Sequence, residues 1–178
     1  MEDSTSSPDT PEAEPGLSGA PPIWNARLIH IYTSSGHDYW GRQGEGRMQH
    51  GINSLSEVEC VAAMGLRGDR YFNKRPNARG QVTFFDLRVV QQIREQFKLP
   101  KLPASIFRRN LIVEGVNLRH WLGKRFRFQG VEFEGAQECT PCEWMDRVIA
   151  LGAEQFLKTG FRGGLRARII TSGLLHVR

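Results

Sequence analysis

The chain has 178 residues, and its 24 lysines and arginines exceed its 19 acidic residues, giving a formal net charge of +5. This length suits a single domain with a hydrophobic core of its own. Three cysteines are an odd number and too few for a disulfide framework, which favours a reducing compartment. The sequence has no apolar run that would cross a bilayer and no secretory or mitochondrial targeting signal, so we expect a cytoplasmic protein without a membrane partner.

The first 22 residues differ in composition from the rest of the chain. They contain five of the nine prolines, five acidic residues and no lysine or arginine. Such a segment cannot bury enough surface to offset its ordering entropy, so we expect residues 1–22 to be disordered and residues 23–178 to form the folded domain. That domain keeps 24 basic and 14 acidic residues, a net charge of +10, which suits an anionic partner such as nucleic acid or a phosphorylated small molecule.

Short β-type runs bounded by turn residues recur through the folded domain. We expect strands at residues 26–32, 81–85, 111–116, 167–170 and 174–177. Residues 37–51 are rich in glycine, arginine and polar residues without a period, which predicts a long loop. Residues 53–63 fit a strand and a short helix.

One helix and one hairpin are predicted in detail. Asp86 is a suitable N-cap for a helix that ends at Leu99-Pro100. Apolar residues recur on one face of this helix at Leu87, Val90, Ile93 and Phe97. A hairpin is predicted around Gln129-Gly130, because apolar residues alternate on both sides, at Phe126, Phe128, Val131 and Phe133. Many short strands with few helices predict an α+β fold that is mainly β, a β-barrel or sandwich with peripheral helices.

The segment 138–144 contains two cysteines in a C-x-x-C pattern at the expected start of a second helix. Thr140 and Glu143 have the spacing of a capping box, and Pro141 would be the first helical residue. Cys142 is then the second helical residue, surrounded by unpaired backbone N–H groups and the positive end of the helix dipole. That environment favours thiolate over thiol, and the thiolate is both a nucleophile and a metal ligand. Cys142 is therefore the candidate catalytic and metal-binding residue.

Other interpretations of the C-x-x-C pattern stay open. A zinc site needs a second pair of ligands at comparable spacing, and the sequence offers only an isolated Cys60 and scattered histidines. A thioredoxin-like disulfide is the stronger rival, although its attacking thiol is the first cysteine, whereas the predicted cap favours the second. Cys139 and Cys142 are otherwise two structural cysteines in a turn between a strand and a helix.

Two further segments combine arginine with groups that bind anions. Their candidate residues are Arg108, Arg109, Asn110, Arg162, Gly163 and Gly164. A guanidinium suits phosphate because it donates two parallel hydrogen bonds, and adjacent glycines can turn successive N–H groups towards one anion. The simpler interpretations are a solvated charge pair at a strand end and a flexible loop. A single Arg-Gly-Gly tract without interleaved aromatic residues is weak evidence for RNA, so we do not expect a nucleic-acid partner.

Six segments of the chain, in this order, resemble the MOSC domain. They are residues 65–70, 80–83, 107–110 with 114–115, 122–124, 141–142 and 162–164. The first of them is also predicted as a tight turn in which Asp69 bonds its own backbone or Arg70. The MOSC domain occurs at the C-terminus of molybdenum cofactor sulfurases and as stand-alone bacterial proteins, and the similarity spans most of residues 26–178.

The resemblance implies a MOSC-type β-barrel and a functional cysteine, at Cys142, that carries sulfur as a persulfide or ligates molybdenum. It also implies that arginines and a glycine-rich segment hold the phosphate and anionic pterin of the molybdenum cofactor (molybdopterin), a role that falls on Arg108, Arg109 and Arg162. The long sulfurases carry a pyridoxal-phosphate desulfurase domain that this chain lacks. A separate cysteine desulfurase or an electron-donor protein is therefore an expected partner.

These observations predict a MOSC domain protein that binds molybdenum cofactor or carries sulfur through Cys142. As an enzyme it would be a molybdenum-dependent oxidoreductase, supporting the reduction of N-hydroxylated compounds, or a sulfurtransferase. Two other classes remain: a C-x-x-C thiol-redox protein, and a small basic nucleic-acid-binding module without catalysis.

Overall fold

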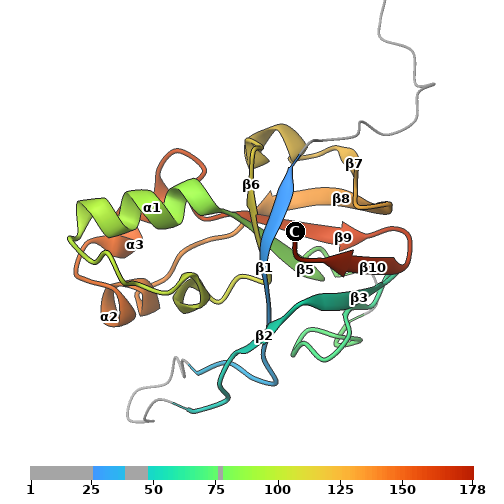
Figure 1. The fold of residues 1–178 in the computed structure, drawn as a ribbon, viewed down its shortest axis with the longest axis horizontal. Helices are drawn as coiled ribbons and strands as arrows, with labels where there is room; N and C mark the ends of the chain where they lie inside the picture. Colours follow the sequence, from blue (N-terminus) through green and yellow to red (C-terminus); the bar gives the residue numbers. More distant parts are fainter. Residues whose placement is uncertain (1–25, 39–47, 76–77) are drawn as a thin grey trace, which may run out of the picture.

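The computed structural model describes residues 26–38, 48–75 and 78–178. The segment 1–22, for which we expect disorder, lies outside the described residues. The strands of the described part form two β-sheets, and the three α-helices gather on one side of the sheets (Figure 1).

The larger sheet has seven strands in the order β2-β1-β6-β5-β9-β8-β7. Its strands are β1 (Arg27–Thr33), β2 (Asn53–Leu55), β5 (Val82–Asp86), β6 (Leu111–Glu114), β7 (Arg125–Phe128), β8 (Val131–Glu138) and β9 (Leu165–Ile169). All neighbouring strands in it are antiparallel except β5 and β6, which are parallel. A parallel pair needs a crossover connection, and the chain between β5 and β6 contains the longest helix.

The smaller sheet has three strands in the order β10-β3-β4. They are β3 (Glu57–Val61), β4 (Gly65–Leu66) and β10 (Gly173–His176). After β9 the chain enters this second sheet, because β10 pairs with β3 and not with a strand of the larger sheet. Among the described residues no pairing joins the two edges of the larger sheet, so the predicted closed barrel is not confirmed, whereas the mainly β α+β class is.

The α-helices are α1 (Leu87–Gln96), α2 (Trp144–Val148) and α3 (Ala153–Lys158), and two 3₁₀ helices span Ala104–Phe107 and Leu118–Trp121. An apolar cluster joins the three α-helices to the large sheet. Its buried members are Phe85, Val89, Val90, Ile93, Ala104, Phe107, Ile112, Trp144, Met145, Ala153 and Leu157. Because Phe85 belongs to β5 and Ile112 to β6, the helices cover that face of the two central strands.

The opposite face of β5 belongs to the main hydrophobic core, which the two sheets share. Phe84 lies in its centre, fully buried, and meets four aromatic rings edge-on at centroid distances of 5.2–6.0 Å. These rings belong to Trp121, Phe126, Phe128 and Phe133. Edge-to-face pairs add to the stabilisation that burial alone provides.

The hairpin is confirmed: Gln129 (φ 48°) and Gly130 (φ 84°) form a two-residue turn between β7 and β8, both with the positive φ of a type I′ turn. The helix is confirmed with its cap, since Asp86 accepts a hydrogen bond from the Arg88 N–H at 2.9 Å. The predicted short helix within residues 53–63 is wrong, because that segment forms β2 and β3.

Candidate functional site

The two cysteines of the C-x-x-C segment lie in different environments. Cys139 directly follows β8 and is 1% exposed, whereas Cys142 is exposed. Helix α2 begins at Trp144, and its N-cap is Glu143, whose side chain makes no capping hydrogen bond. Cys142 therefore lies outside the helix, and the capping box predicted from Thr140 is wrong.

Contacts with the start of β9 keep this segment extended. The Cys139 N–H donates to the Gly164 carbonyl at 2.7 Å, beyond the last paired residues of β8 and β9. A Cβ atom on Gly163 would lie 2.0 Å from the Cys139 carbonyl oxygen and 3.3 Å from Cδ of Pro141, so glycine is required there. Pro141 is buried, and a proline disfavours helical conformation in the residue before it. Because of these contacts with β9, the helix begins only at Trp144, and Cys142 remains at the surface.

The third cysteine, Cys60, lies in β3 and is fully buried. Burial, reinforced by the neighbouring carboxylate of Glu59, raises the pKa of the Cys60 thiol to about 12. This thiol stays protonated at neutral pH and has no access to solvent. Of the three cysteines in the chain, Cys142 is the exposed one.

Arg109 connects the cysteine segment to the start of β6. Its Nε donates to the carbonyl of Gly163 at 3.0 Å, and its Nη1 donates to the carbonyl of Phe107 at 3.1 Å. The guanidinium also lies over the ring of Phe85, 6.0 Å from the centroid. Arg109 is only partly buried, and no hydrogen bond from its Nη2 is formed with the described residues. The sequence-predicted residues Arg109, Gly163 and Gly164 therefore do come together.

Arg108 points elsewhere, although it is the neighbouring residue. Its backbone is left-handed (φ 53°), and its side chain is 5% exposed. The guanidinium donates to Asp38 Oδ2 at 2.8 Å, to Ser34 Oγ at 3.0 Å and to the Gly36 carbonyl at 2.6 Å. These bonds hold the loop after β1 against the 3₁₀ helix at 104–107, so Arg108 has a structural role. The sequence did not reveal Asp38 as its partner, because the two residues are 70 positions apart.

Asn110 is buried and links three segments. It accepts from the N–H and Oγ1 of Thr83 at 3.1 and 2.9 Å, and it donates from Nδ2 to the Tyr32 carbonyl and to Asp69 Oδ1, both at 3.1 Å. Asp69 also accepts from the Tyr71 N–H at 3.1 Å, which confirms the predicted turn. Asn110 therefore ties β1, β5 and the turn at residue 69 together.

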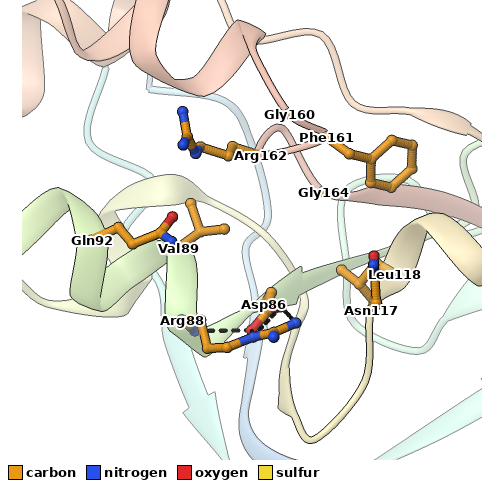
Figure 2. A pocket seen from close by; sticks show the side chains of 10 residues that line it. All are labelled: Asp86, Arg88, Val89, Gln92, Asn117, Leu118, Gly160, Phe161, Arg162 and Gly164. Atoms are coloured by element: carbon orange, nitrogen blue, oxygen red, sulfur yellow. Dashed lines mark hydrogen bonds and ion pairs between the residues drawn. The ribbon is translucent and has the colours of Figure 1, made fainter.

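Arg162 lies in a different place from the other two candidate arginines. Its Nη1 donates to Thr159 Oγ1 at 2.9 Å, and its guanidinium stacks on the ring of Phe156 at 4.2 Å. With Gly164 it lines a cavity of about 230 Å³ beside α1, in which Figure 2 shows the Asp86–Arg88 pair on the opposite side. The resemblance assigned Arg108, Arg109 and Arg162 to one anionic cofactor. In the structure these three arginines do not line one common cavity.

Arg108 and Arg109 instead line a recess between β1 and the start of β6. Its lining residues are Tyr32, Thr33, Ser34, Ile52, Asp69, Arg70, Arg108, Arg109 and Asn110. The Nε atom of Arg70 is buried and has no hydrogen-bond partner within the described part of the chain. A buried donor without an acceptor is costly. The recess has a volume of about 10 Å³, room for about one water molecule, so a larger anion would meet these arginines only at its mouth. Arg70 was quoted in the family resemblance but was not predicted as a site residue.

A second cavity, of about 250 Å³, extends from Arg108 towards the cysteine segment. It is lined by Asp38, Gly51, Ile52, Ser105, Ile106, Arg108 and Trp144. Because Trp144 is two residues after Cys142, this cavity connects the surroundings of Arg108 with the segment that carries the exposed thiol.

Residues 26–38, 48–75 and 78–178 lack two features. They hold no group of three or more histidine, cysteine or acidic side chains placed to bind a metal ion. They also contain no helix with the length and apolar character to span a membrane.

The fold and site define a mainly β domain with one exposed cysteine, on a segment that packs against Gly163, and Gly163 is bonded by Arg109 of the arginine-lined recess. The model of the MOSC domain family matches residues 72–177, more than half of the chain. The chain therefore belongs to the MOSC domain family, which confirms the resemblance seen in the sequence. No curated protein matches the sequence.

Solved structures share the fold at low sequence identity. The YuaD protein from Bacillus subtilis has a TM-score of 0.61 and 14% identity, with 86% of this chain and 94% of that chain covered. YiiM from Geobacillus stearothermophilus has a TM-score of 0.59 and 11% identity, with 85% and 71% covered. YiiM from Escherichia coli has a TM-score of 0.56 and 16% identity, with 83% and 65% covered. The chain thus spans less than two thirds of YiiM from Escherichia coli. All these similarities show the fold alone.

Proposed function

We propose that this MOSC domain binds the molybdenum cofactor, or carries sulfur for it, through Cys142. The observation that carries the proposal is the exposure of this thiol, since Cys60 and Cys139 are both buried. A thiolate is a soft ligand, which suits molybdenum, and it is also a nucleophile that can hold sulfur as a persulfide.

The arginines of the recess offer positive charge to an anionic group of the cofactor. The recess has a volume of only about 10 Å³, so the cofactor would lie over its mouth and not inside it. Arg70 and Arg109 line one recess, and each has a donor without a partner among the described residues, Nε in Arg70 and Nη2 in Arg109. Phosphate and pterin oxygens are suitable acceptors for such charged donors. We assign the anion to Arg70 and Arg109. Arg108 and Asn110 shape the recess through their internal hydrogen bonds.

Gly163 and Gly164 support the site in another way. Gly164 accepts the hydrogen bond from Cys139, and Gly163 allows the close approach of the cysteine segment. They position Cys142 through the backbone and do not need to touch the ligand. Arg162, which lines a separate cavity, has no role in this proposal.

When bound, the molybdenum centre supplies two-electron oxygen-atom transfer, such as the reduction of N-hydroxylated compounds. Cys142 would ligate the metal or hold sulfur as a persulfide, and the two arginines would hold the anion in place. A separate electron-donor protein or cysteine desulfurase would serve the site from outside the chain.

The C-x-x-C thiol-redox alternative fits the burial pattern less well. In thioredoxin-like chemistry the first cysteine of the pair attacks the substrate and must be accessible. Here the first cysteine, Cys139, is buried and the second, Cys142, is exposed.

The test is elemental analysis of the full chain produced together with the molybdenum cofactor pathway, combined with an assay for sulfur released by cyanide. Wild-type protein should contain molybdenum or labile sulfur, and Cys142→Ser should lose it, because serine does not ionise near neutral pH and is a hard ligand.

Cys139→Ala is the matched control, with thermal unfolding recorded to confirm that it folds. It should keep most of the bound molybdenum or sulfur. If Cys142→Ser kept its full content of molybdenum or labile sulfur, the proposal would be disproved. If both variants lost molybdenum or sulfur equally and the oxidised wild type contained a Cys139–Cys142 disulfide, thiol-redox chemistry would be favoured.

A further inference from the structure

A cationic cavity lies apart from the recess described above. Its volume is about 450 Å³, larger than the other cavities described here. It is lined by Tyr71, Lys74, Arg75, Ala78, Arg79, Gly80, Gln137 and Arg166. Four of these eight residues are cationic and none is acidic.

The four cations form a group that no carboxylate of the described residues neutralises. Eight lysines and arginines among the described residues form ion pairs with carboxylates, for example Arg88 with Asp86 and Arg168 with Glu134. None of the four cations around this cavity pairs with a carboxylate of the described residues. Like charges gathered around one space repel one another, and an anion placed between them relieves that repulsion.

Two elements give this cavity its walls. On the sheet, Arg166 of β9 pairs in register with Gln137 of β8, so the two side chains lie next to each other. On the loop before β5, the Lys74 ammonium lies 5.5 Å from the centroid of the Tyr71 ring. Gly80 closes the loop against Arg166, because a Cβ atom there would lie 3.3 Å from its Cδ. Donors therefore reach the cavity from a sheet and from a loop.

We propose that this cavity binds a free small molecule that carries a phosphate group or several carboxylates. Its volume is within the range of small-molecule sites, roughly 300–1,000 Å³. Arginine and lysine side chains at its walls supply charge-assisted hydrogen bonds to such an anion, and Gln137 adds a neutral donor and acceptor. The inference goes beyond the proposed function of Cys142 and does not depend on it.

The test is calorimetric titration of the full chain, produced without molybdenum, with pyrophosphate at about physiological ionic strength. Wild-type protein should bind pyrophosphate, and Arg166→Gln and Arg79→Gln should each weaken the affinity about tenfold, as expected when one charge-assisted contact is lost. Arg125→Gln is the control, because Arg125 is exposed on β7 and pairs with Glu132 outside the cavity. It should bind as the wild type does.

Absence of binding by the wild type, or an equal loss in Arg125→Gln, would overturn the proposal. Tighter binding of short single-stranded DNA, weakened by the same two substitutions, would also overturn it and identify a nucleic-acid surface. The same titration of molybdenum-loaded protein tests whether the cavity holds the phosphate of the cofactor. Unchanged affinity supports a separate ligand, whereas loss of pyrophosphate binding would assign the cavity to the cofactor itself and refute a separate ligand.

Discussion

Arg109 donates a hydrogen bond from Nε to the carbonyl of Gly163, 54 residues later in the chain, at 3.0 Å. The same glycine lies against the carbonyl of Cys139, so one guanidinium supports the backbone on which the cysteine segment rests. Arg109 also faces the recess that Arg70 lines. A residue that both supports the segment and lines the recess would couple the position of the thiol to the proposed anion site.

Replacement of Arg109 by alanine should lower both the stability of the fold and the amount of molybdenum that the protein retains. Two carbonyls, of Gly163 and Phe107, lose their donor, which we expect to lower the free energy of unfolding by roughly 1–3 kcal/mol in chemical denaturation. Molybdenum retained per folded protein should fall as well. Arg147→Ala is the control, since its ion pair with Glu143 is exposed and should contribute about 0–1 kcal/mol. Equal metal loss in both variants would contradict the assignment.

Gly163→Ala tests the close approach of the cysteine segment. A methyl group 2.0 Å from the Cys139 carbonyl must displace that segment, so we expect a loss of roughly 1–3 kcal/mol in the free energy of unfolding and new reactivity of Cys139 towards alkylating reagents. Gly123→Ala is the control for glycine replacement without a clash: no atom lies within 4 Å of its Cβ position, although Gly123 has a positive φ (+71°) that Gly163 lacks. Cys139 should remain unlabelled in that variant.

Features set by neighbouring residues were predictable from the sequence. The Gln129-Gly130 turn and the Asp86 cap depend on a few adjacent residues and on apolar periodicity, and both are confirmed. The MOSC resemblance likewise rested on short segments in a fixed order, and the family match confirms it.

Features set by distant contacts were not predictable in this way. Thr140 and Glu143 have the spacing of a capping box, but no helix begins there. Gly163 and Gly164 contact Cys139 and keep the segment extended. The many short strands predicted a barrel or a sandwich, and the MOSC resemblance implied a barrel. Neither specifies which strands pair, and the barrel is not confirmed among the described residues.

The Arg108–Asp38 ion pair should be important for stability because both side chains are almost fully buried, at 5% and 6% exposed. Arg108→Ala leaves a buried carboxylate without this partner, and we expect a loss of about 3–5 kcal/mol in the free energy of unfolding. Arg125→Ala, which removes an ion pair with a 62% exposed arginine, should cost less than about 1 kcal/mol. Similar losses in the two variants would mean that the buried pair contributes nothing beyond an exposed one.

Cys60 should make the protein less stable at alkaline pH. Its pKa is raised from 9.0 to about 12 in the folded state, so above pH 9.0 the unfolded chain releases a proton that the folded chain keeps. Stability is then complete below pH 9.0 and falls towards pH 12, by at most about 1.4 kcal/mol per pH unit. Cys60→Ala should show a shallower alkaline decline in urea unfolding, and an identical slope would refute this role.

The three cysteines should differ in their rate of alkylation in the native protein. Cys142 should be labelled first because it is exposed, whereas Cys139 and Cys60 should react only when the structure opens. Mass spectrometry of peptides after brief iodoacetamide treatment at neutral pH measures the order, and Cys142→Ser should remove the rapid phase. Labelling in urea is the control, in which all three thiols should react. Faster labelling of Cys139 than of Cys142 in the native state would refute the assignment of Cys142 as the accessible thiol, and with it the proposed ligand of the site.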